Sequence, residues 1–142
     1  MSSTQFQSPI YRIFEEAFNR GNLAVVDDVL APGHCARNAF GGAPNGPEGL
    51  KWLIAMFRTA FPDLHCDIDD EIRDGDKLAA HWTMRGTHKG LFLGNPPTGR
   101  SVEVQGIIFA RISNGRMIED WTLVDQLGIL QQLGLVPPPK GY

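Results

Sequence analysis

Apolar side chains recur every three or four positions through the first sixty residues, which is the spacing of one helix face. Ser8 before Pro9 is typical of a helix start, because serine can cap free backbone N–H groups and proline fits the first turn. Pro32 stops a second apolar run, and Pro47 opens a third. Residues 33–47 are rich in Gly, Pro and Asn, which predicts a loop. We therefore expect three helices, over residues 9–20, 23–30 and 47–61.

The period of the pattern changes to two after Pro62, where apolar and polar residues begin to alternate. Asp74-Gly75 and Asn114-Gly115 are strong signals of tight turns between antiparallel strands. Residues 86–100 are again rich in Gly and Pro and predict a loop. We expect strands over residues 64–72, 78–85, 102–112 and 116–124, followed by a last helix over residues 125–133.

Helices followed by strands indicate an α+β fold, with the helices packed on one face of a curved antiparallel sheet. A sheet of that shape leaves an internal pocket above the helices. No repeat or shift of composition divides the chain, so we expect residues 1–142 to form one domain. Residues 136–142, which include Pro137-Pro138-Pro139, should form an extended tail.

Composition and charge narrow the classes of function. Charged residues make up 20% of the chain, the net charge is -3, and acidic and basic residues are mixed. Nucleic acid or an anionic membrane would require clustered lysines and arginines, so neither partner is expected. No apolar run approaches the roughly 18 residues of a membrane span, and residues 1–5 lack signal-peptide features, which predicts a cytoplasmic protein. Cys35 and Cys66 are too few for a structural zinc site or a disulfide framework.

Five short motifs follow one another in order along the chain. They are Phe61-Pro62-Asp63, Gly75-Asp76, Gly86-Thr87-His88, Pro96-Pro97-Thr98-Gly99-Arg100 and the segment from Asn114 to Trp121. Together with residues 125–134, this order and spacing resembles the SnoaL-like polyketide cyclase (ester cyclase) family. The resemblance covers nearly the whole chain. It implies the cystatin-like cone of the nuclear-transport-factor superfamily, in which N-terminal helices and a curved sheet enclose a pocket.

The resemblance also implies a chemistry. In the characterised cyclases, an aspartate on the last strand removes a proton flanked by carbonyl groups, and the enolate closes a ring by intramolecular aldol addition without a metal or cofactor. The family places this aspartate directly after the tryptophan of the last strand, and here that position holds Thr122. A neutral hydroxyl cannot remove a proton from carbon without an activated partner. Either another residue is the base, or the protein does not catalyse the family reaction.

Two carboxylates are the candidate catalytic residues. Asp120 lies two positions before Thr122, so strand alternation places both side chains on one face of the sheet and in the same cavity. Apolar walls would suit a general base there, and the alternative is an acid paired with an arginine or at the cavity rim. Asp125 follows the strand directly, and the alternative to a catalytic role for it is the N-cap of the last helix.

Five residues are candidates for substrate binding: His34, Asn38, Trp82, His88 and Thr122. His34 and Asn38 occupy the loop where the family carries polar residues, and the amide of Asn38 could bind a carbonyl or hydroxyl group. His88 could donate to a ligand carbonyl, or it could anchor its own loop by a hydrogen bond. Trp82 could form the cavity wall or only the core.

These residues predict a cofactor-free enzyme that acts on a small hydrophobic carbonyl compound through an enolate, by aldol cyclisation or isomerisation. The alternative is a non-catalytic protein of the same fold that binds a small molecule, because Thr122 replaces the catalytic aspartate. Trp121 has the opposite parity to Asp120 and should face away from the pocket. A tryptophan on that outer face would suit a sheet-to-sheet contact, so we expect a homodimer.

Overall fold

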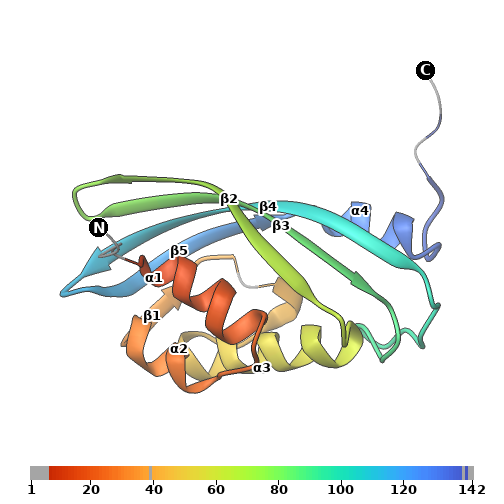
Figure 1. Cartoon of the computed structure of the whole chain (residues 1–142), viewed down its shortest axis with the longest axis horizontal. Coiled ribbons are helices and arrows are strands. Elements are labelled where there is room, and N and C mark those ends of the chain that lie inside the picture. Colours follow the sequence, from red (N-terminus) through yellow and green to blue (C-terminus); the bar gives the residue numbers. More distant parts are fainter. Residues whose placement is uncertain (1–6, 39, 139, 141–142) are drawn as a thin grey trace.

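The structure of the chain is a computed structural model that describes residues 7–38, 40–138 and 140 (Figure 1). The residues on which the expectation of no signal peptide depends, 1–5, lie outside the described residues. Residues 139, 141 and 142 of the predicted tail also lie outside them. Pro137 and Pro138 have no regular secondary structure.

The described residues form an α+β fold, which confirms the predicted class. The helical segments are α1 (Pro9–Arg12), η1 (Ile13–Phe18), α2 (Ala24–Val29), η2 (Phe40–Gly42), α3 (Gly46–Ala60) and α4 (Gln126–Gln132). The strands are β1 (Leu30–Ala36), β2 (His65–Asp74), β3 (Lys77–Thr87), β4 (Ser101–Ser113) and β5 (Arg116–Val124).

The first helix begins where the sequence predicts, but its winding changes. Ser8 caps it, since the Oγ atom accepts a hydrogen bond of 3.0 Å from the backbone N–H of Tyr11. The chain then winds as the π-helix η1, and the N–H of Asn19 donates to the carbonyl of Phe14, five residues back, at 3.0 Å. Phe14 and Phe18 lie on the buried face of this segment, where their rings stack with centroids 5.2 Å apart.

The strands form one sheet in the order β1-β5-β4-β3-β2. Neighbouring strands from β2 to β5 are antiparallel, as the two hairpin signals predict. β1 lies at the edge and runs parallel to β5, with Cys35 opposite Glu119 and Ala36 opposite Asp120. The antiparallel prediction therefore holds for four strands, and a parallel fifth strand that the sequence does not indicate is added to them.

β1 begins at Leu30, the last residue of the predicted second helix, and continues into the segment for which the sequence predicts a loop, residues 33–47. Pro32 and Gly33 lie within this strand, and both residue types are poor strand formers. An edge strand tolerates them because one side of its backbone needs no partner, and the pairing with β5 is irregular between Leu30 and Cys35. The loop prediction is thus wrong for the first four residues of that segment.

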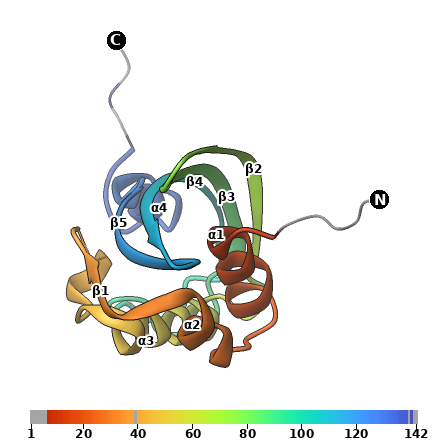
Figure 2. The same cartoon turned by 90° about the vertical axis from the view of Figure 1, so that its left-hand side faces the viewer.

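The sheet is curved, and its concave face covers the helices (Figures 1 and 2). α1, η1 and α3 lie beneath this face, and α4 packs against β4. Alternate side chains of β3 and β4 are buried in the common core, among them Leu78, Ala80, Trp82, Val104, Ile108 and Ala110. The alternation that predicts these strands therefore also gives their buried face.

One inward position of β4 has no side chain. Gly106 lies opposite Trp82 of β3, and a Cβ atom at this position would overlap the Cζ2 atom of the indole ring. The ring thus fills the space that a side chain at position 106 would need.

Gly106→Ala should destabilise the protein, because the added methyl group displaces Trp82 from a packed core. We expect the free energy of unfolding to fall by about 1–3 kcal/mol, measured by urea denaturation. Gly33→Ala is the matched control, since a Cβ atom there meets nothing within 4 Å. Equal stability of the two variants would show that the indole ring moves aside without cost.

Candidate active site

A cavity of about 120 Å³ lies between the concave face of the sheet and the helices. Its wall is formed by α1, η1, α3, β1, the loop after β1, and inward side chains of β3, β4 and β5. Asn38 and Pro44 are lining residues that are exposed to solvent, and both belong to the segment between β1 and α3. The cavity therefore opens beside this segment.

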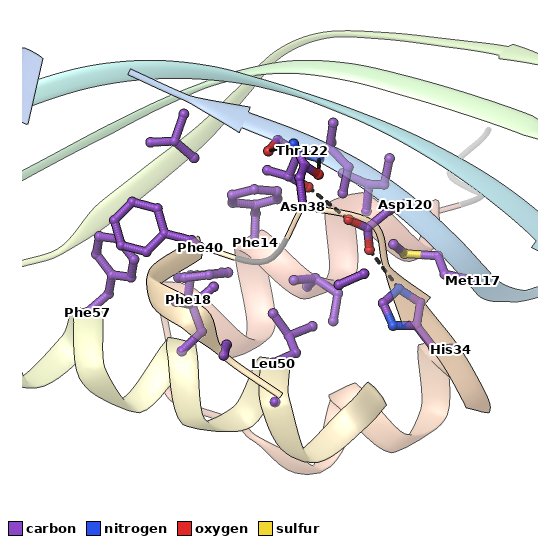
Figure 3. A pocket seen from close by; sticks show the side chains of 18 of the residues that line it. Phe14, Phe18, His34, Asn38, Phe40, Leu50, Phe57, Met117, Asp120 and Thr122 are labelled. Carbon is purple, nitrogen blue, oxygen red and sulfur yellow. Dashed lines mark hydrogen bonds and ion pairs between the residues drawn. The ribbon is translucent and has the colours of Figure 1, made fainter. Parts of the chain in front are cut away.

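Most of the cavity wall is apolar. Figure 3 shows Phe40 and Phe57 at one end of the cavity, and His34 and Asp120 at the other. The large apolar lining residues include Phe14, Phe18, Phe40, Phe57, Trp82 and Met84. Such a wall favours a ligand with an apolar body and few polar groups.

Three polar side chains from two adjacent strands are hydrogen-bonded to one another at the polar end (Figure 3). His34 Nε2 of β1 lies 2.6 Å from Asp120 Oδ2 of β5. Thr122 donates its hydroxyl to Asp120 Oδ1 at 2.9 Å. The side chain of His34 is 3% exposed and that of Asp120 13%. The structure thus brings together three of the residues that the sequence nominates.

A bulge in β5 determines which of its side chains reach the cavity. Glu119 pairs with Arg111 of β4, but Met117 pairs with the very next residue of β4, so Ile118 is an extra residue in β5. Met117 and Asp120 therefore both line the cavity although they are three positions apart. Strict alternation gives the direction of Asp120 and misses that of Met117.

Side chains just beyond the end of β1 stabilise its pairing with β5 through hydrogen bonds. The side-chain amide of Asn38 donates to the carbonyl of Thr122 and accepts from its N–H, both at 2.8 Å. These two bonds extend the hydrogen bonding between β1 and β5 beyond the end of β1. Glu119 accepts hydrogen bonds from Arg37 Nη2 at 2.6 Å and from Arg111 Nε at 3.0 Å. These two guanidinium groups lower the pKa of Glu119. Asn38 lines the cavity, but the donor and acceptor that are predicted to bind a ligand already have partners in the protein.

Trp82 and His88, two further candidates for binding, have different surroundings. Trp82 lines the cavity, and among the described residues its Nε1 has no hydrogen-bond partner. His88 is fully buried outside the cavity wall, where its Nδ1 accepts from the N–H of Thr98 at 3.1 Å and its ring packs on Phe61. The geometry of His88 supports the loop-anchoring alternative and not contact with a ligand.

Asp125 does not line the cavity. It is the N-cap of α4, and its Oδ1 accepts a hydrogen bond of 2.9 Å from the N–H of Gly128. The structure does not bring it to Asp120. The geometry therefore supports the capping alternative and gives no support to the predicted catalytic role.

The described residues contain neither a metal-binding cluster nor a membrane-spanning helix. Within residues 7–38, 40–138 and 140, no three His, Cys, Asp or Glu side chains are grouped so that they could hold a metal ion. In the same part of the chain, every helix is too short or too polar to cross a bilayer. The two cysteines are free thiols, and burial raises the pKa of Cys66 to about 12.

The sequence matches one protein family over most of its length. The SnoaL-like polyketide cyclase family matches residues 8–133, from the N-cap of α1 to the C-cap of α4. The chain belongs to this family.

Relatives of the SnoaL-like chain agree with this assignment. Aklanonic acid methyl ester cyclase DnrD from Streptomyces peucetius is 27% identical over 140 residues, which cover 96% of this chain and 97% of the relative. TsrD from Streptomyces laurentii has a similar structure, with a TM-score of 0.84 and 29% identity over 96% of this chain and 99% of that one. Wild-type IdmH from Streptomyces antibioticus has a TM-score of 0.76 and 33% identity, over 89% and 96% of the two chains. The expected family and cone fold are confirmed.

The contact between His34 and Asp120 is the feature of this SnoaL-like site that sequence analysis misses. Both residues are nominated, but they are 86 positions apart and the part of β1 that carries His34 lies in a predicted loop. A local signal exists, because Leu30, His34 and Ala36 have the same parity and are directed inward. Pro32 interrupts this alternation and hides the strand.

Asp125→Ala should remove the cap of α4 and lower the free energy of unfolding by about 1 kcal/mol. Asp125→Asn should change the free energy of unfolding by only about a few tenths of a kcal/mol, because an amide oxygen accepts the same hydrogen bond from Gly128. Urea denaturation of both variants provides the comparison. An equal loss in the two would mean that the negative charge, and not the hydrogen bond, stabilises the helix.

Proposed function

We propose that this protein is a cofactor-free enzyme that removes a proton next to a carbonyl group of a small hydrophobic compound. The observation that carries this proposal is the position of Asp120. Among the described residues of the cavity wall, it is the only carboxylate. An apolar wall around the base would limit the access of water to the reacting atoms, which would protect an enolate from unwanted protonation.

The proposed reaction conserves every atom of the substrate. The C–H bond beside the carbonyl breaks, and its proton moves to Asp120. The enolate carbon attacks a second carbonyl of the same molecule, which forms a carbon–carbon bond and an alkoxide. The proton then returns from Asp120 to the alkoxide oxygen. Its return to a different carbon would make the reaction an isomerisation.

The size of the cavity limits the part of the substrate that it can enclose. An apolar protein cavity of roughly 150 Å³ admits benzene, so the 120 Å³ here suits a group of about one ring. A larger compound would extend through the opening beside Asn38 and Pro44. Since DnrD is a cyclase of aklanonic acid methyl ester, we propose a carbonyl compound of that kind as substrate.

Binding without catalysis is the second candidate function. Thr122 stands where the resemblance places the catalytic aspartate, and its hydroxyl is already donated to Asp120. A cavity of this composition would hold an apolar ligand even if Asp120 served only to orient it.

Replacing Asp120 tests the enzymatic proposal. The wild-type protein should convert aklanonic acid methyl ester to a product of the same mass and a different retention time, followed by liquid chromatography and mass spectrometry. Asp120→Asn should lower kcat/KM by about 10²- to 10⁴-fold, because an amide of the same shape cannot accept the proton. Asp70→Asn, at an exposed position of β2, is the matched control and should retain turnover.

Undiminished turnover by Asp120→Asn would remove this residue from the mechanism. Thr122→Asp separates the two candidate functions, because it restores a carboxylate at the position of the family base. An inactive wild-type protein that gains turnover through Thr122→Asp would favour binding without catalysis.

We further propose that the protein is a homodimer joined through the outer face of its sheet. This face carries two cross-strand pairs of exposed apolar residues, Ile107 opposite Leu123 and Phe109 opposite Trp121. The rings of Phe109 and Trp121 contact each other edge to face, with centroids 5.7 Å apart. Contiguous apolar surface of this kind is typical of protein–protein contacts. The same face of a second copy would cover all four side chains.

Leu123→Asp should convert the dimer to a monomer, because the interface would then bury an unpaired carboxylate. Sedimentation velocity measures the change. Leu91→Asp is the control, since Leu91 is 60% exposed and lies in the segment between β3 and β4, outside the sheet. A monomeric wild-type protein, or a dimer that survives Leu123→Asp, would rule out this interface.

A further inference from the structure

His34 has an environment that a ligand-binding histidine would not have. Its Nε2 is occupied by Asp120 Oδ2 at 2.6 Å. Its Nδ1 is covered by protein and has no hydrogen-bond partner among the residues that the structure describes. Neither ring nitrogen is therefore free to contact a substrate in the cavity.

The surroundings of the two nitrogens favour one tautomer of His34. An N–H group at Nδ1 would be buried without an acceptor, which costs free energy that a lone pair at this position does not. The proton of this hydrogen bond therefore lies on Nε2 and is donated to Asp120. Nδ1 keeps its lone pair.

Asp120 accepts a second hydrogen bond on its other oxygen, from the Thr122 hydroxyl at 2.9 Å. The two donors come from different strands, and in this arrangement each binds a different carboxylate oxygen. A carboxylate oxygen has two lone pairs, so each oxygen retains one that is not used. The carboxylate is thus held in one orientation while it can still accept a proton.

We propose that His34 is the positioning residue for Asp120: it holds the carboxylate turned so that a free lone pair faces the substrate. The substrate proton moves to that lone pair and later leaves from it. The hydrogen bond from His34 persists through both steps, and His34 neither gains nor loses a proton. This inference rests on the proposed function, because it concerns the proposed base.

Nitrogen-15 NMR of the full chain near pH 7 tests the hydrogen bond without any substrate. The ring signals of His34, assigned by their loss in His34→Gln, should show a protonated Nε2 and an unprotonated Nδ1. A protonated Nδ1, or a ring protonated on both nitrogens, would overturn the inference.

Kinetics with aklanonic acid methyl ester test the positioning role. His34→Leu removes the donor and should lower kcat by about 100-fold with little change in KM, because the base is no longer aligned. His34→Gln places an amide N–H near the former Nε2 and should recover about tenfold of that loss. Urea denaturation of both variants separates this effect from a general loss of stability.

Wild-type kcat in His34→Leu, or equal activity of the Leu and Gln variants, would overturn the positioning role. If His34→Leu fails to fold, the kcat of His34→Gln decides. A kcat below the wild-type value with little change in KM supports the role, and a wild-type kcat contradicts it. If the wild-type protein does not convert the probe while NMR shows the expected protonation, the proposed function fails and the assigned hydrogen bond stands.

Discussion

The parallel pairing of β1 with β5 is the contact on which the polar end of the cavity depends. It sets Ala36 beside Asp120, which brings the imidazole of His34 within hydrogen-bonding distance of the carboxylate. Backbone pairing alone is short and irregular here. The amide of Asn38 and the guanidinium of Arg37 add bonds to β5 just beyond the end of the strand. These bonds stabilise the position of β1, an edge strand that contains poor strand formers, as part of the cavity wall.

The sequence predicts most of the fold because most of it is encoded in local patterns. The antiparallel strands follow one another along the chain, and their alternation and tight turns are visible within windows of about ten residues. β1 differs, since its position is stabilised by residues far along the chain. The bonds between Asn38 and Thr122, for example, join residues 84 positions apart. The spacing of apolar residues within a short window contains no information about such a contact.

The sequence also predicts most residues of the candidate site, but it does not show which of their polar atoms are occupied by hydrogen bonds within the protein. Strand alternation places Asp120 and Thr122 together correctly. His34, Asn38 and His88 carry suitable groups, yet hydrogen bonds within the protein already engage them. A residue type reveals chemical capacity, whereas availability to a ligand depends on neighbours that only the folded chain provides.

The two ends of the cavity are built from different parts of the chain. The aromatic end comes from η1, η2 and α3, and the polar end from β1 and β5 (Figure 3). Substitutions at Phe40 or Phe57 would reshape the space for the ligand without removing any hydrogen bond to Asp120. Ligand preference and chemistry can therefore evolve separately in this architecture. A mutant library that seeks new specificity would vary the helical wall and leave the strands unchanged.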